Sequence, residues 1–296
     1  MTKKYGICAL CGKISELTYE HIPPRNAFNA KPSKSYSGDK ILFDSERLPW
    51  EVDGLKYTSN QRGAGRYSLC RECNNNTGSW YANTYNEIAS VIAQAIFKSK
   101  EEPIQGIKIE GIYGVRFIKQ ILSMFCSVNH HLFLQKHINQ HIEEFEEAKT
   151  PLEQLIIGTK RGLKNAAIMI DELRNFVLDR EKVGIDKSKF KICMYITDSN
   201  ISKFVGIVSS IDYKNNDFLV LSEITSWPLG FVLYFNPPAN FEFTGVDITA
   251  LSDLKYDEKV NIEFPFQIQE MNTVLPLDYR SKEQIESDAK RSLSEE

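Results

Sequence analysis

Two Cys-x-x-C pairs constrain this chain more than any other feature of its sequence. Cys8 and Cys11 form the first pair, Cys70 and Cys73 form the second, and 58 residues separate Cys11 from Cys70. Four thiolates presented from two tight turns suit the tetrahedral coordination that zinc prefers in structural sites. We therefore expect one Zn²⁺ to clamp the two ends of a long insertion. Gly12 is expected to supply the positive φ that such a turn often needs.

The composition is that of a globular protein. Hydrophobic residues make up 42% and charged residues 25% of the 296 positions, which are ordinary fractions. No apolar run approaches the ~18 residues of a membrane span, and the N-terminal sequence lacks the apolar core of a secretory signal. We expect a cytoplasmic protein, in which paired cysteines favour metal over disulfides. The two other cysteines, Cys126 and Cys193, lie in apolar segments and are expected to be buried.

The formal net charge of −3 is unevenly distributed along the chain. Residues 1–80 carry 12 Lys/Arg against 8 Asp/Glu, so a weakly basic front precedes an acidic remainder. Lys31, Lys34 and Lys40 contribute to this positive charge. The distribution permits a polyanionic partner, such as nucleic acid, at the front of the chain without requiring one.

The front and the middle of the chain differ in their residue patterns. Residues 1–85 contain the cysteines and a long, polar stretch at 29–66, which predicts an extended insertion loop. Apolar residues then recur at three- and four-residue steps, and this spacing predicts helices over 79–98, 115–128, 132–148 and 152–178. A short strand is predicted at 107–112.

The last third of the chain has the character of a β region. Short β-branched and aromatic runs predict the strands of an antiparallel meander at 190–197, 204–211, 218–224 and 231–235, with two more at 241–246 and 260–266. The whole pattern predicts an α+β fold. Its expected units are residues 1–85, a helical region at 86–180, an antiparallel β region at 181–280 and a charged tail at 281–296.

An acid–histidine pair and a run of asparagines lie beside the cysteines. Glu20 and His21 follow the first pair by nine and ten residues, and Asn74 directly follows Cys73. If zinc joins the two pairs, Glu20 and Asn74 face one another across a small pocket, where their oxygens suit Mg²⁺. Neighbouring residues of a strand point to opposite faces. We therefore expect His21 to stand off the cation as a general base.

Together these residues resemble a known family. The pattern C-x-x-C-G … E-H-I-x-P … L-C-x-x-C-N resembles the HNH, or ββα-metal (His-Me finger), nucleases with a zinc clamp. Asparagine after the last cysteine is similar to the phage junction-resolving endonucleases, which share R-x-x-L-C-x-x-C-N, here residues 66–74. The resemblance covers about residues 5–85. It implies a ββα-metal domain in which His21 deprotonates water while Glu20 and Asn74 hold a catalytic Mg²⁺ or Mn²⁺.

Two further groups complete the expected site. The middle residue of the family motif, usually an asparagine that orients the histidine, has no clear match, because Asn60 stands ten residues before Cys70. A backbone carbonyl near Tyr67 is the expected substitute. Three arginines flank the site and are candidates for contacts with the substrate phosphate: Arg25, Arg66 and Arg71.

The sequence thus favours a divalent-metal-dependent endonuclease that hydrolyses DNA phosphodiester bonds. Two alternatives stay open. One is a catalytically inactive, zinc-stapled module that binds nucleic acid or protein, and the other is a nuclease that acts on RNA. Residues 90–296 would position substrate or mediate contact with a protein partner or a second copy of the chain, and no membrane partner is expected.

Overall fold

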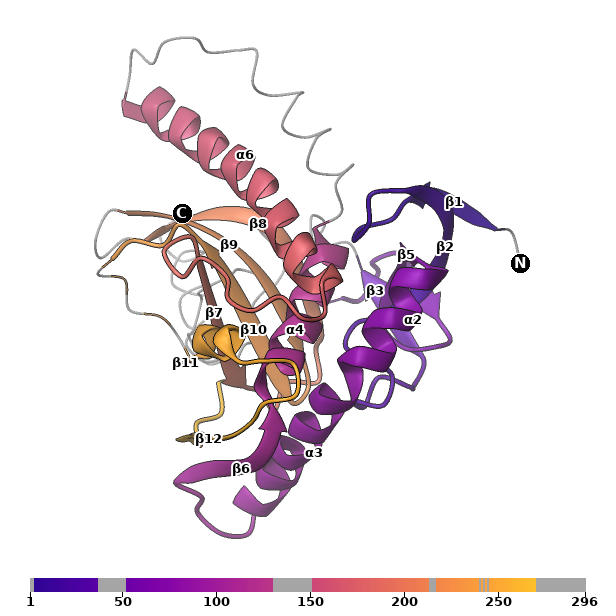
Figure 1. Cartoon of the computed structure of the whole chain (residues 1–296), viewed down its shortest axis with the longest axis vertical. Coiled ribbons are helices and arrows are strands. Elements are labelled where there is room, and N and C mark those ends of the chain that lie inside the picture. Colours follow the sequence, from indigo (N-terminus) through magenta and orange to yellow (C-terminus); the bar gives the residue numbers. More distant parts are fainter. Residues whose placement is uncertain are drawn as a thin grey trace.

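The computed structural model describes residues 3–36, 52–129, 151–212, 217–239, 241, 243 and 245–269. Over these residues the protein has an α+β fold, as the sequence predicts. A small sheet that carries the cysteines and a five-stranded antiparallel sheet lie on either side of a buried helix, α4 (Figure 1). None of the helices in the described ranges combines the length and the apolarity that crossing a bilayer requires.

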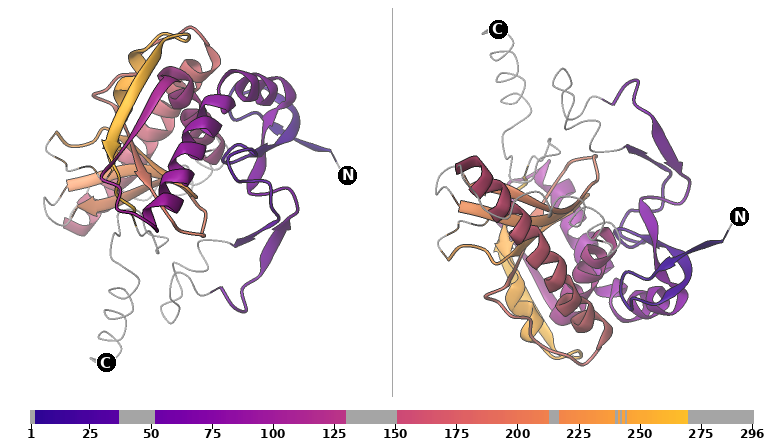
Figure 2. Two further views of the ribbon diagram at one scale, coloured as in Figure 1. Left: turned by 90° about the horizontal axis from the view of Figure 1, so that it is seen from below. Right: turned by 90° about the horizontal axis from the view of Figure 1, so that it is seen from above.

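The small sheet is antiparallel in the order β1-β2-β5. Its strands are β1 (Lys4–Ile7), β2 (Ile14–His21) and β5 (Gly65–Cys70). The predicted loop between β2 and β5 instead contains a two-stranded ribbon of β3 (Ser33–Tyr36) and β4 (Tyr57–Asn60). Figure 2 shows this ribbon standing away from the helices and the five-stranded sheet. Residues 37–51 of the insertion, including Lys40, are outside the described residues.

Two helices follow β5, and the second of them is the helix predicted over 79–98. They are α2 (Arg71–Trp80), which follows β5 directly, and α3 (Ala82–Ser99). The chain leaves the helical path at Tyr81, whose ring is fully buried and whose hydroxyl donates to the carbonyl of Val177 at 2.8 Å. The helix predicted over 79–98 is therefore confirmed as α3, with its start three residues later at Ala82, and the break at Tyr81 was not predicted.

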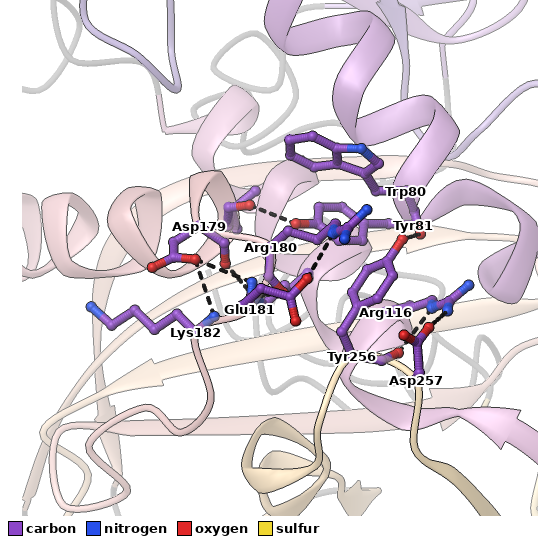
Figure 3. Close-up of polar contacts among 11 residues, drawn as sticks. Trp80, Tyr81, Arg116, Asp179, Arg180, Glu181, Lys182, Tyr256 and Asp257 are labelled. Carbon is purple, nitrogen blue, oxygen red and sulfur yellow. Dashed lines mark hydrogen bonds and ion pairs between the residues drawn. The ribbon is translucent and has the colours of Figure 1, made fainter.

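The junction between α2 and α3 is held by contacts from distant parts of the chain (Figure 3). The hydroxyl of Tyr256 donates to the carbonyl of Trp80 at 3.2 Å, next to the buried ring of Tyr81. Guanidinium groups of Arg116 and Arg180 lie 4.0 and 4.6 Å from the centroid of the Tyr256 ring. Such cation–aromatic contacts fix the C-terminal end of α2, and therefore the direction in which its N-terminus points.

The helix α4 forms the centre of the molecule. It spans Gly114–Val128 and directly follows the strand β6 (Gly106–Tyr113). The next helix in the described part of the chain is α6 (Pro151–Leu178). All residues of α4 except Arg116 are buried, which confirms the predicted buried helix. Its buried Lys119 donates to the carbonyls of Asp179 and Arg180 at 2.6 and 2.9 Å, just beyond the end of α6. The predicted helix at 132–148 is outside the described residues.

The five-stranded sheet has the order β11-β7-β10-β9-β8. Its strands are β7 (Phe190–Ile196), β8 (Lys203–Asp212), β9 (Asp217–Ser226), β10 (Leu229–Phe235) and β11 (Val246–Asp247). Only β8, β9 and β10 form a meander, because β7 pairs with β10. After a 3₁₀ turn (Thr249–Asp253), β12 (Lys259–Pro265) pairs with β6 and not with this sheet. The prediction of a simple meander was therefore wrong in its strand order.

One hydrophobic core connects the parts that the sequence predicts as separate units. A continuous cluster of buried side chains extends from Cys8 to Phe264 and includes α3, α4, α6 and the inner face of the sheet. The boundaries at residues 85 and 180 stay predictions. Both lone cysteines, Cys126 and Cys193, are fully buried, as expected. The tail at 281–296 is outside the described residues.

Candidate metal centre and the adjoining acid–histidine site

Four thiols meet between the small sheet and α2. The Sγ atoms of Cys8, Cys11, Cys70 and Cys73 all lie within 4.8 Å of one another, and those of Cys11 and Cys70 are 3.9 Å apart. Tetrahedral zinc with Zn–S bonds of about 2.3 Å separates its sulfurs by about 3.8 Å. The donor set therefore fits Zn²⁺ in both chemistry and spacing. We call these residues the four-thiol cluster.

Each cysteine pair lies in a local structure that aims two sulfurs at one point. In the first pair, the N–H of Gly12 donates to the carbonyl of Cys8 at 3.0 Å, and Gly12 has φ of 71°. That conformation strains residues with a Cβ, and the sequence predicts it. In the second pair, Cys70 is the N-cap of α2, and its Sγ accepts from the N–H of Cys73. Cys70 thus serves both as the helix cap and as a member of the cluster.

One member of the cluster, Cys8, favours the thiolate form, whereas burial raises the pKa of Cys11 and the hydrogen bond with Cys8 raises the pKa of Cys73. The N–H of Cys70 donates to Cys8 Sγ at 3.3 Å, and the N-terminus of α2 adds a partial positive charge. The thiol of Cys73, followed by the backbone amides around it, lowers the pKa of Cys8 to about 4. Hydrogen bonds and helix dipoles that lower a thiol pKa also favour metal binding. Cys8 therefore offers a thiolate to a cation, and metal binding would displace the protons that Cys11 and Cys73 retain.

The last residue of β2 is His21, and its ring is held by the chain that returns to β5. Its Nε2 lies 2.9 Å from the carbonyl oxygen of Arg62. A carbonyl only accepts, so Nε2 carries the proton, and in the neutral ring Nδ1 keeps its lone pair. Burial lowers the pKa of His21, and the charges of Arg25 and Arg62 act in the same direction. The ring is therefore neutral at pH 7 and able to accept a proton at Nδ1.

A single asparagine fixes the loop around this histidine. Asn29 Nδ2 donates to the carbonyls of Pro23 and Ala64, both at 2.7 Å. Its Oδ1 accepts from the N–H of Ala64, also at 2.7 Å. Sequence reasoning missed both Asn29 and the carbonyl of Arg62. The acceptor for the histidine ring was expected to be a carbonyl near Tyr67. The acceptor in the structure is the carbonyl of Arg62, five residues earlier, because the turn before β5 places Arg62 beside the ring.

Glu20 points away from His21, as strand alternation predicts, and into the core. Its side chain is 5% exposed, and its Oε2 accepts hydrogen bonds from the hydroxyls of Ser68 and Ser127, the former at 2.9 Å. Burial raises the pKa of Glu20 to about 7, although both hydroxyls favour the carboxylate. Oε1 forms no hydrogen bond with the described part of the chain. The Ser127 contact comes from α4, 107 residues along the chain, and no feature of the sequence indicates it.

Asn74 lies in the first turn of α2 with its side chain against β2. Its Nδ2 donates to Thr18 Oγ1 at 2.9 Å and to the carbonyl of Tyr19 at 3.2 Å. Since the carbonyl of Tyr19 can only accept, the orientation of the amide is determined. Asn74 Oδ1 accepts no hydrogen bond from the residues that the structure describes. Glu20 and Asn74 thus each retain one oxygen without a hydrogen bond, and their joint binding of a cation stays a prediction.

The three predicted arginines have different surroundings. Arg66 donates from Nη1 to the carbonyls of Ser127 and Val128 at 3.2 and 3.0 Å and so caps the C-terminus of α4. Arg25 and Arg71 are exposed. Arg25 is close enough to His21 to lower its pKa. One of the three therefore has a structural contact that the sequence did not predict.

Comparison of the chain with protein-family models, with curated proteins and with solved structures gave no match.

Proposed function

We propose that the protein is a divalent-metal-dependent endonuclease that hydrolyses DNA phosphodiester bonds, with His21 as its general base. One observation carries the proposal. A neutral imidazole with an available Nδ1 stands at the end of β2, and the N-terminus of α2 contacts the same strand through Asn74 and Tyr19. The four-thiol cluster joins the turn that precedes β2 to the N-terminus of α2.

His21 has the properties of a general base. The carbonyl of Arg62 fixes its tautomer and its ring plane, and the edge of the Tyr19 ring packs against it at 5.3 Å between centroids. A neutral histidine is an efficient base near pH 7. In the proposed reaction, Nδ1 takes a proton from water and the resulting hydroxide bonds to phosphorus. The bond from phosphorus to the 3′ oxygen breaks, and that oxygen leaves.

Glu20 and Asn74 are the groups that would hold a catalytic Mg²⁺ or Mn²⁺. Both supply oxygen donors, which hard cations prefer, and each has one oxygen without a hydrogen bond in the described residues. When bound, the cation would stabilise negative charge on the phosphate and on the leaving oxygen. Arg25 and Arg71 are exposed and supply the proposed phosphate contacts, whereas Arg66 has Nη1 engaged by α4.

The test is nicking of supercoiled plasmid by the zinc-loaded, full-length protein with Mg²⁺ or Mn²⁺. We expect nicking by the wild type, loss of at least 10²-fold in rate for His21→Ala, as is typical for removal of a general base, and no change for Lys108→Ala. Lys108 is an exposed lysine of β6. Equal nicking by wild type and His21→Ala refutes the assigned role. A matched RNA substrate in the same assay decides between DNA and RNA.

A non-enzymatic binding module is the second candidate, and the burial of Glu20 favours it. A carboxyl that is 5% exposed and has a pKa near 7 is half protonated at neutral pH, which opposes cation binding. Calorimetric titration of zinc-loaded protein with Mn²⁺ separates the two candidates. A second site that is lost in Asn74→Ala supports the nuclease. Nucleic-acid binding without a second cation site supports the binding module.

A further inference from the structure

Three aromatic rings from distant parts of the chain meet at the surface, and we call them the aromatic cluster. Phe28 ends the turn that follows β2, Phe97 lies in the last turn of α3, and Trp227 joins β9 to β10. The ring centroids of Phe28 and Phe97 lie 4.7 and 5.8 Å from that of Trp227. Phe28 is 47% and Phe97 59% exposed. Apolar residues scattered singly over a surface are ordinary, whereas exposed rings gathered in one place mark a binding site.

The backbone at Phe28 is strained. Its φ is 64°, in the left-handed region that bulky residues rarely occupy and that glycine or asparagine occupies at less cost. Strain of this kind is concentrated at binding and catalytic sites, where the surrounding structure holds it. The chain thus carries a phenylalanine where a smaller residue would be more stable. The aromatic ring itself is therefore what this position supplies.

Phe28 is tied to the same carbonyl group as the end of β2. Asn29, which follows Phe28, donates from Nδ2 to the carbonyl of Ala64 at 2.7 Å. Ile22, which follows His21, donates its N–H to that same carbonyl at 3.1 Å. The backbones at His21 and Phe28 are therefore each one residue away from a shared acceptor. A nucleic-acid strand held at His21 is within reach of the Phe28 ring.

Trp227 is a fixed support for the two phenylalanines. Its Nε1 donates to Asp198 Oδ1 at 3.3 Å, and Asp198 also pairs with Lys100 at 3.2 Å. The rings of Phe28 and Phe97 meet the indole at interplanar angles of 72° and 60°. Neither ring therefore lies flat on the indole, and both remain accessible to solvent. A support that is fixed before binding reduces the entropy lost when a ligand binds.

The exposed aromatic area is too small for a stable protein interface. A large aromatic side chain offers about 150–250 Å², so two rings that are each roughly half exposed offer about 200 Å². A specific protein–protein interface takes about 800 Å² from each partner. A nucleobase, in contrast, needs only one ring face for stacking. Charge does not decide this choice, because Lys98 and Lys100 beside the cluster are paired with Glu102 and Asp198.

We propose that the aromatic cluster stacks on unpaired bases of the DNA strand whose phosphate lies at His21. This rests on the proposed endonuclease function and assigns its substrate as DNA with a single-stranded region. In a duplex each base is stacked between its neighbours, so an aromatic side chain reaches a base face only where the base is unpaired. The Phe28 ring takes the base next to the phosphate, and the Phe97 ring takes a base further along the strand.

The test measures DNA binding by the full-length, zinc-loaded protein without added divalent cations, so that no strand is cut. Fluorescence anisotropy follows a labelled single strand of about 20 nucleotides, longer than the ~4–16 nucleotides of typical single-strand sites. Its duplex and a strand of the same length with abasic sites in place of the bases are measured beside it. The ring variants are Phe28→Asn and Phe97→Ala. Asparagine tolerates the φ of Phe28, and the matched control is Tyr5→Ala, whose side chain is 68% exposed on β1.

Each ring variant is expected to bind the single strand about 5- to 150-fold more weakly than wild type, the loss of one base–aromatic stack. The slope of log affinity against log salt is expected to stay unchanged, because the contacts with phosphates remain. The duplex and the abasic strand are expected to bind wild type and the ring variants equally, and Tyr5→Ala is expected to match wild type. The urea midpoint of Phe28→Asn is expected to equal or exceed that of wild type, because the strain at φ of 64° is relieved.

Unchanged single-strand affinity in either ring variant overturns the assignment, as does an equal loss of affinity for the duplex or for the abasic strand. A lower urea midpoint for Phe28→Asn with unchanged affinity means that the ring only stabilises the fold. A dimer that dissociates in the ring variants, with DNA affinity unchanged, identifies the cluster as an interface between copies of the chain. Both of these results also overturn the assignment.

Plasmid nicking with Mg²⁺ keeps this result separate from the proposed function. Nicking by wild type, together with single-strand binding that the ring variants leave unaltered, refutes the stacking site alone. Ring-dependent single-strand binding by a protein that never cuts DNA refutes the endonuclease and leaves the stacking site in place.

Discussion

Zinc removal is the sharpest test of the front of this protein, and Cys11→Ser is the variant for it. Cys11 is the more exposed member of the first pair, so the loss of its sulfur adds little direct packing cost. Serine is a far weaker zinc ligand than thiolate. The variant therefore reports the contribution of the metal and not that of the side chain.

The expected loss of stability on zinc removal follows from how little apolar surface the two cysteine turns and the adjoining end of β5 bury. Apart from the cysteines, the fully buried residues of the two knuckles and the adjoining end of β5 include Ala9, Leu10 and Leu69. At about 1.5–3 kcal/mol for each large side chain, the two leucines supply about 5 kcal/mol. A structural zinc contributes roughly 10–16 kcal/mol in isolated zinc-finger peptides. Loss of the metal therefore removes more stabilisation than the local apolar contacts supply.

The assay combines zinc quantification with amide hydrogen exchange. Wild type should contain one zinc per chain, released by a thiol-reactive mercurial, and Cys11→Ser should contain little. In the variant, amides of residues 4–21 and 65–80 should exchange fast, while those of β10 remain protected by the five-stranded sheet. The control is Cys193→Ala, a buried cysteine outside the cluster. Full zinc content and unchanged protection in Cys11→Ser would falsify the zinc-staple reasoning.

Three further outcomes are expected. Asn29→Ala removes three hydrogen bonds across the loop, so it should cost about 2–4 kcal/mol in urea unfolding and lower nicking while zinc content stays constant. Glu20→Gln should become more stable relative to wild type as pH rises from about 4.5 to 7. Because the folded protein raises the pKa of Glu20, the protonated carboxyl stabilises the folded state fully below the pKa that Glu20 has in the unfolded chain. This stabilisation is lost as pH rises through the folded pKa of about 7. The difference, about 3 kcal/mol, is measured as urea midpoints without added Mg²⁺. Lys119→Met leaves the carbonyls beyond α6 without donors and should cost about 2–4 kcal/mol, whereas Lys108→Met should cost under about 0.5.

The parts of the fold that the sequence predicts are those that local physics decides. Knuckle spacing predicts the four-thiol cluster because two intervening residues bring both sulfurs to one ion. Strand alternation predicts that Glu20 and His21 point apart, and apolar residues on every side of 115–128 predict a buried helix. These inferences need only neighbouring residues, and the structure agrees with each of them.

The parts that sequence reasoning missed depend on contacts between distant segments. Strand composition does not encode pairing order, so the position of β7 beside β10 and the pairing of β12 with β6 were not predictable. The carbonyl that holds His21 belongs to Arg62, and a backbone acceptor leaves no trace in residue type. The partner of Glu20 is Ser127, one of several ordinary serines until α4 is placed.

That last contact changes how the candidate site must be understood. Both Glu20 and Arg66 form hydrogen bonds with the final turn of α4. The carboxylate of Glu20 accepts from the hydroxyl of Ser127, and the guanidinium of Arg66 donates to the carbonyl of Val128. The residue that follows, Asn129, accepts from the N–H of Ile207 in β8 at 2.7 Å and donates to a serine hydroxyl of β9 at 2.9 Å. The carboxylate proposed to bind a cation is thus positioned by a helix end that the large sheet also holds. Its orientation is therefore a property of the whole described core and not of residues 1–85 alone, so the rest of the chain contributes directly to the geometry of the proposed site.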